Sequence, residues 1–169
     1  MSNNLVKIQE CITADALVKD DKYLVEPANK TKQNRTNIKL STNSQYLLYS
    51  FEQIKKPLFP FFNNSNNPPT GLNAIADYVV FTDKHVFVIE LKGNKNPESQ
   101  LWATKQLVKY LINSINRVSK INYEPEIRGL SNSTHPKFRP STNVGKNPYD
   151  SHENAKINQE ELILDYYMQ

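Results

Sequence analysis

The chain has 169 residues, enough for one domain with a substantial hydrophobic core. Its four glycines argue against a glycine-rich phosphate loop, and its single cysteine excludes an internal disulfide and a cysteine-based zinc site. No apolar run approaches the ~20 residues of a membrane helix, and the first residues lack the apolar segment of a signal peptide. We therefore expect one soluble, cytoplasmic domain without a membrane contact.

The net charge of +4 is unevenly distributed along the chain. Residues 117–146 hold six basic and two acidic residues, whereas residues 147–169 hold one basic and five acidic residues. A basic body with an acidic tail is typical of a protein that binds a polyanion and has a separate docking end. An ordinary solvated surface would give the same pattern.

The first part of the chain mixes apolar segments with polar loops. Residues 5–18 predict a helix, residues 22–27 predict a short strand, and residues 28–37 are loop-like. Residues 45–54 are compatible with helix or strand, and we favour a strand at their start. Residues 56–71 contain too many proline and asparagine residues for regular structure.

Two apolar runs, residues 78–81 and 86–91, predict a pair of buried strands. Both faces of the second run are apolar, which indicates a central strand that is covered on both sides. A helix should follow, with Asn96 as its cap, Pro97 at its first position and Glu98 at the positive end of its dipole. An apolar stripe at helical spacing would bury one side of this helix (Leu101, Val108, Leu111, Ile115 and Val118).

The remaining chain divides into three segments. Residues 126–132 predict another strand, so the core of the domain should span residues 40–132 or thereabouts. Residues 133–159 form a long polar loop in this interpretation. Residues 160–169 are an apolar C-terminal segment, which would either dock a partner or pack on the core of its own chain.

Charged residues stand at one end of the two buried strands. If Asp83 and Lys84 form the turn, the pairing that continues outward from this turn sets Asp77 opposite Glu90, with Cβ atoms about 5 Å apart. Lys92 shares a face with Glu90, at about 6.6 Å along the strand. The three side chains should therefore converge at one end of a buried sheet.

Two carboxylates opposed in a poorly solvated place favour a divalent cation between them. Ligands that are all oxygen select magnesium, manganese or calcium rather than zinc. A metal held in this way can clamp a phosphate and activate water, and a nearby lysine can stabilise the developing charge. This is the chemistry of phosphodiester hydrolysis.

Asp77 followed after twelve residues by Glu90-Leu91-Lys92, on an apolar strand that precedes a helix, resembles the PD-(D/E)xK nuclease superfamily. The resemblance covers residues 70–130 and implies an α/β protein with a restriction-endonuclease-like core, a central mixed β-sheet flanked by helices. It implies that Asp77 and Glu90 are metal ligands for Mg²⁺ or Mn²⁺ and that Lys92 is the catalytic lysine. Ala76 replaces the proline of the motif, and Glu52 or Glu10 would have to supply the acid of the first core helix.

Gln106 and Tyr110 match the QxxxY element found on the next helix in the recombination-exonuclease branch of this superfamily. Being one turn apart, they share a helix face, which we expect to look across at the metal site. We predict that they contact nucleic acid together with Lys95, Lys105 and Lys109, although a solvated face is the alternative for Lys105 and Lys109.

These residues lead to a prediction of function. The resemblance implies a Mg²⁺- or Mn²⁺-dependent deoxyribonuclease, an endonuclease rather than an exonuclease, that belongs to a repair or anti-phage (antiviral) defence complex. Its partners would be DNA and a protein, such as an ATPase subunit or a second copy of the chain. The alternative is a non-catalytic subunit that keeps the nuclease fold and binds nucleic acid or scaffolds a complex.

Overall fold

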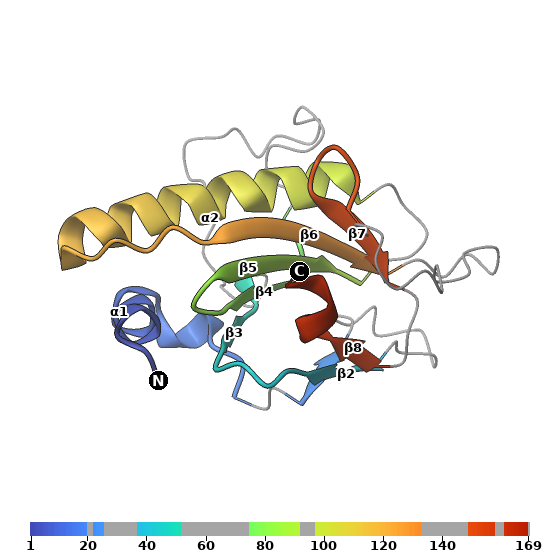
Figure 1. The fold of residues 1–169 in the computed structure, drawn as a ribbon, viewed down its shortest axis with the longest axis horizontal. Helices are drawn as coiled ribbons and strands as arrows, with labels where there is room; N and C mark the ends of the chain where they lie inside the picture. Colours follow the sequence, from blue (N-terminus) through green and yellow to red (C-terminus); the bar gives the residue numbers. More distant parts are fainter. Residues whose placement is uncertain are drawn as a thin grey trace.

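The computed structural model describes residues 1–19, 22–25, 37–51, 75–91, 97–132, 149–157 and 161–168. Within these residues the chain is an α/β fold with two β-sheets. The larger sheet has five strands in the order β3-β4-β5-β6-β7, and the smaller has three in the order β1-β2-β8. Figure 1 shows helix α2 along one side of the larger sheet and the smaller sheet on the opposite side.

The larger sheet is mixed, as expected. Strand β4 (Tyr78–Phe81) pairs antiparallel with β3 (Leu47–Tyr49) on one side and with β5 (His85–Glu90) on the other. Helix α2 (Glu98–Ser119) then crosses over to β6 (Glu126–Asn132), which is parallel to β5, as a β-α-β unit requires. Strand β7 (Asn154–Ile157) adds to β6 in parallel and completes the sheet.

Strand β5 lies at the centre of the sheet, and all six of its residues are buried. Its side chains alternate between two separate hydrophobic cores, which confirms a central strand covered on both faces. Val86 and Val88 pack in the core beneath α2 and helix α1 (Asn3–Cys11), whereas Phe87 and Ile89 pack in the core on the opposite face.

The face opposite α2 is covered by strands rather than by a helical layer. This second core contains side chains from β1 (Tyr23–Val25), β2 (Asn37–Ser41), β8 (Glu161–Ile163) and the short 3₁₀ helix η3 (Leu164–Tyr167). The described α-helices, α1 and α2, both contribute to the first core. The expectation of a sheet flanked by helices therefore holds for one face.

The C-terminal segment packs on the core of its own chain, which is one of the two outcomes weighed for it. Strand β8 pairs in parallel with β2, and Leu162 and Leu164 are completely buried. The backbone carbonyl of Tyr167 accepts hydrogen bonds from Arg128 Nη1 (2.5 Å) and from the Tyr149 hydroxyl (2.7 Å). The apolar residues of this segment are thus used to close the second core.

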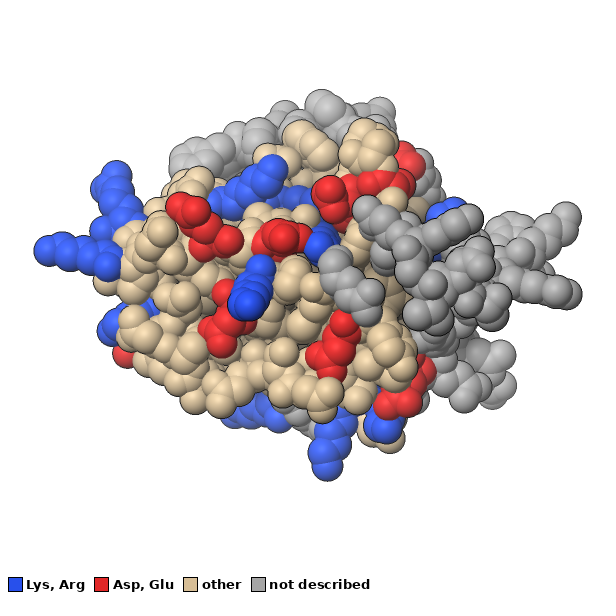
Figure 2. All heavy atoms as spheres, in the orientation of Figure 1, with Lys and Arg blue, Asp and Glu red and all other residues tan. Residues whose placement is uncertain are grey.

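The acidic residues of this segment also make contacts within the chain. Glu161 forms an ion pair with Lys39 at 2.8 Å, and Asp165 accepts hydrogen bonds from the Thr42 hydroxyl at 2.7 Å and the Asn43 amide at 3.0 Å. Acidic and basic side chains are interspersed over the face of the molecule shown in Figure 2. Among the described residues on that face, acidic and basic side chains therefore do not separate into two surfaces.

Several expectations about local structure were wrong. The predicted polar loop over residues 133–159 contains β7. Strand β2 is Asn37–Ser41, and the sequence pattern had assigned no element to residues 38–41. Val118, placed in the buried stripe of α2, is 73% exposed. None of the described helices is long and apolar enough to cross a membrane.

A truncation inside the docked tail should measure its contribution to stability. Leu162→Ala removes a completely buried side chain and should lower the free energy of unfolding by about 2–5 kcal/mol, the range for such cavities. Tyr166→Ala, four residues further on, removes a side chain that is 61% exposed and should change it by less than about 0.5 kcal/mol. Urea denaturation measures both. An effect of Leu162→Ala as small as that of Tyr166→Ala would show that the tail is not part of the cooperative core.

Candidate active site

The hairpin of β4 and β5 has the register that the sequence predicts. Phe81 pairs with Val86 and Tyr78 pairs with Ile89, so the next pair outward sets Asp77 opposite Glu90. Thr82 fixes the two-residue turn, because its backbone N–H donates to His85 O at 2.9 Å and its hydroxyl accepts from the His85 N–H at 3.0 Å. Strand alternation directs both acids to the face of the sheet that α2 covers.

Asp77 and Glu90 are both completely buried. Asp77 Oδ2 accepts a hydrogen bond from the backbone N–H of Leu91 at 2.7 Å, so this carboxylate ties the start of β4 to the residue that follows β5. The preceding residue is also fixed, since the Ala76 N–H donates to the Thr104 hydroxyl of α2 at 2.7 Å. Helix and strand together therefore hold the aspartate in place.

The register across the sheet extends this acid pair into a row of polar side chains. Glu90 pairs with Ser131 of β6, and Ser131 pairs with Lys156 of β7, so all three side chains point to the α2 face. We call Asp77, Glu90, Ser131 and Lys156 the polar row. It lies at the carboxyl ends of three parallel strands, which is where open α/β sheets commonly bind ligands.

The polar row changes from buried to exposed along its length. Glu90 has no exposed surface and Ser131 is 5% exposed, whereas Lys156 is exposed on the edge strand of the sheet. Neither Ser131 nor Lys156 was among the predicted site residues. Ser131 lies in a strand that the sequence predicts, but its register against Glu90 is not visible in the sequence, and the segment that contains Lys156 was predicted as a loop. Only the pairing of β6 with β7 brings that lysine level with Glu90.

Lys105 is buried and has a structural role in this fold. Its ammonium group donates to three oxygens of the turn before and at the start of β7: His152 O at 2.8 Å, Glu153 O at 3.0 Å and Asn154 Oδ1 at 2.8 Å. Burial lowers the pKa of Lys105 to about 8. Gly129 permits this contact, because a Cβ there would overlap Asn154 Oδ1. Contact with a phosphate would require Lys105 to leave these partners.

The expected QxxxY face of α2 does not look toward the acids. Gln106 is exposed, Lys109 is exposed, and Tyr110 is 68% exposed. Thr104, the residue of α2 that contacts the segment before Asp77, is separated from Gln106 by about 200° of helical rotation. Gln106 and Tyr110 therefore lie on the outer side of the helix, away from the polar row.

The remaining predicted residues fall into two groups. Lys92, Lys95 and Glu52 lie outside the described residues. Glu10 is described and forms an ion pair with Lys7 at 2.6 Å on the surface of α1. Since α1 begins beside the hairpin turn, where Ser2 contacts Asp83, Glu10 lies at the opposite end of the strands from Glu90 and cannot complete the acid pair.

The acid pair suits a hard divalent cation by its chemistry. Two carboxylates on facing strands would supply oxygen ligands from one face, and Mg²⁺ is commonly held by one or two carboxylates while waters and substrate phosphates complete its octahedron. In the described part of the chain, no cluster of three or more histidine, cysteine, aspartate or glutamate residues could hold a metal ion. A site built from these residues would thus rely on two acids.

Comparison with known proteins finds no family model, no curated protein and no solved structure that matches the chain.

The role of Lys105 can be tested against its exposed neighbour Lys109, one turn away on the same helix. Lys105→Met leaves three buried or partly buried oxygens without their donor and should cost about 1–3 kcal/mol of unfolding free energy. Lys109→Met should be close to neutral in the same urea titration. Equal, small effects would show that the Lys105 contacts do not stabilise the protein.

The lowered pKa of Lys105 gives a second, independent signal. Between pH 8 and its ordinary value of 10.5, the folded lysine has lost a proton that the unfolded chain still binds. The contribution of Lys105 to the free energy of unfolding therefore rises with pH over that interval. The stability of the wild type minus that of Lys105→Met should increase from pH 7 to pH 9.5. A flat difference would contradict a lowered pKa.

Proposed function

We propose that this protein is a metal-dependent nuclease that hydrolyses DNA phosphodiester bonds and has a restriction-endonuclease-like core. The observation that carries the proposal is the register of the β4–β5 hairpin, which continues one pair beyond Tyr78–Ile89 to set Asp77 opposite Glu90 at the carboxyl end of a central strand. Ser131 and Lys156 continue the same row across β6 and β7. A mixed sheet with a β-α-β crossover directly after the acid-bearing strand supports the same interpretation.

The residues of the polar row and Lys92 would have different roles in the reaction. Asp77 and Glu90 would hold a Mg²⁺ or Mn²⁺ ion, which when bound supplies positive charge to the phosphate under attack. Lys92 follows Glu90 by two residues and would stabilise the negative charge that develops in the transition state. Ser131 can donate a hydrogen bond from its hydroxyl to a phosphate oxygen.

Lys156 would meet the substrate first. It is the exposed member of the row and stands about 10 Å from Glu90 across two strand spacings, which a flexible four-carbon side chain can partly close. A phosphate entering from the β7 edge would contact this ammonium group before it reaches the buried acids. We assign Lys156 to binding of the DNA backbone.

The biological setting follows from the sequence resemblance. We propose an endonuclease that acts in the cytoplasm, in repair or anti-phage defence, with a protein partner such as an ATPase subunit or a second copy of the chain.

One observation favours a second candidate function. Both acids are completely buried, and Asp77 has a structural task at the end of the hairpin. A non-catalytic subunit that keeps the fold and binds nucleic acid or scaffolds a complex would retain these residues for stability. Binding of Mn²⁺ to the purified protein, measured by calorimetry, separates the two candidates, because only the nuclease requires it.

Isosteric changes at the two acids test catalysis without destroying the hairpin. Asp77→Asn keeps an oxygen acceptor for the Leu91 amide, and Glu90→Gln keeps the shape of the side chain. Each should abolish Mg²⁺-dependent cleavage of plasmid and single-stranded DNA, because each removes a charged ligand. Thermal melting controls for folding. Undiminished cleavage by the Glu90→Gln protein would assign the activity to a contaminant or to another site.

The two lysines should differ in the kinetic constant that they affect. Lys92→Ala should lower kcat about 10²-fold or more, as for loss of one donor that stabilises the transition state. Lys156→Ala should mainly raise KM and reduce the dependence of binding on salt, because it removes a contact to the phosphate backbone. Wild-type kinetics in Lys156→Ala would remove this residue from the proposed site.

A further inference from the structure

The outer side of α2 presents a stripe of aromatic, amide and basic side chains. Its members follow at helical spacing and fall within about 100° of helical rotation. Trp102 is 63% exposed and Tyr110 is 68% exposed, which is unusual for side chains of this size. We call the following residues the outer stripe: Trp102, Gln106, Lys109, Tyr110, Asn113 and Arg117.

The charge of the outer stripe has one sign. Lys109 and Arg117 are its charged members, and Lys120 caps the C-terminal end of the helix. After Glu98 in the first turn, α2 contains no acidic residue. The acids of the neighbouring turn, Asp150 and Glu153, interact electrostatically with Lys105 on the flank of the helix. The stripe therefore suits a polyanion.

The aromatic rings narrow the choice of polyanion. Trp102 and Tyr110 are eight residues apart, which is about 12 Å along the helix. Lys109 lies between them on the same side of the helix, and Arg117 lies two turns beyond Tyr110. Exposed aromatic rings stack on bases whose faces are accessible, as they are in single strands but not inside a duplex. Basic side chains beside the rings would contact the phosphates.

We propose that the outer stripe binds single-stranded nucleic acid, with bases stacked on Trp102 and Tyr110 and phosphates held by Lys109 and Arg117. This surface is distinct from the polar row, which lies under the opposite side of the helix. It would hold a strand whether or not the polar row cleaves it.

The experiment uses Trp102 as its own reporter, because it is the single tryptophan of the chain. Oligothymidylate is titrated into the protein in EDTA, so that metal-dependent cleavage plays no part. Tryptophan fluorescence should be quenched to saturation, and the affinity should fall as salt is raised. A duplex of the same length should bind more weakly, since its bases cannot stack on the rings.

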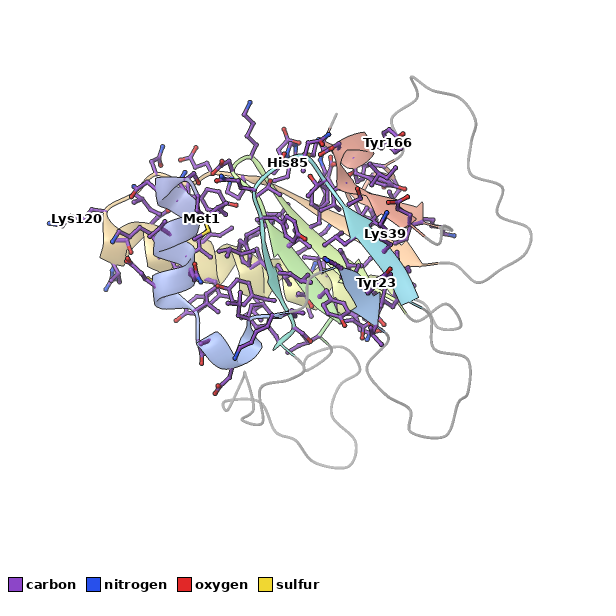
Figure 3. All side chains as sticks on the ribbon, turned by 90° about the horizontal axis from the view of Figure 1, so that it is seen from below. Met1, Tyr23, Lys39, His85, Lys120 and Tyr166 are labelled. Carbon is purple, nitrogen blue, oxygen red and sulfur yellow. The ribbon has the colours of Figure 1, made fainter. Side chains whose placement is uncertain are left out.

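Variants locate the binding site. Trp102→Ala and Tyr110→Ala should each weaken binding of a labelled oligothymidylate about ten-fold or more, measured by fluorescence anisotropy. Tyr166→Ala is the matched control, because it removes another exposed tyrosine at the end of the molecule opposite Lys120, where α2 ends (Figure 3). It should leave the affinity unchanged.

Three outcomes would overturn the proposal. The first is equal affinity in Trp102→Ala and the wild type, and the second is equal affinity for single strand and duplex. The third is a fluorescence change that follows protein concentration without oligonucleotide, which would make the stripe a contact between copies of the chain. Loss of cleavage with binding retained would instead bear on the polar row alone.

Discussion

The register of the β4–β5 hairpin is the constraint on which the rest of the site depends. A slip of one residue would turn every side chain of one strand to the other face and separate Asp77 from Glu90. Two features oppose such a slip: the turn held by Thr82 and His85 at one end, and the contact of Asp77 with the Leu91 amide at the other. Buried apolar side chains on both faces of β5 hold the register between these ends.

A second set of contacts places the exposed end of the polar row. Lys105 joins α2 to the turn that precedes β7, and Gly129 leaves room for this contact on β6. These contacts fix β7 against β6 two residues before Lys156. Lys105 of the helix therefore contributes, together with the pairing of β7 with β6, to the position of Lys156 on the edge strand. The three hydrogen bonds offset part of the cost of removing the Lys105 ammonium group from water.

Local pattern predicted the parts of the fold whose partners are close in sequence. The hairpin register, the central position of β5, helix α2 and strand β6 all followed from periodicity and turn residues. Strands β2 and β7 carry polar residues on their exposed side, so little in their own sequence distinguishes them from a loop, and they form by pairing with distant strands. The acid pair could be predicted because its two strands are adjacent in sequence. Lys156 could not, because its strand is recognised only through its pairing with β6.

One side of helix α2 is buried against the sheet and the other is exposed, so the helix contributes to two different surfaces. Its inner side, through Thr104 and the apolar core residues, supports the strand that carries Asp77. Its outer side leaves Trp102 and Tyr110 exposed to solvent, so their apolar surface does not contribute to the hydrophobic core. A motif match alone assigned Gln106 and Tyr110 to the acid site, but rotation about the helix axis separates them from it. Gln106 and Tyr110 therefore belong, with Trp102, to the outer surface of the helix, where their side chains are exposed to solvent.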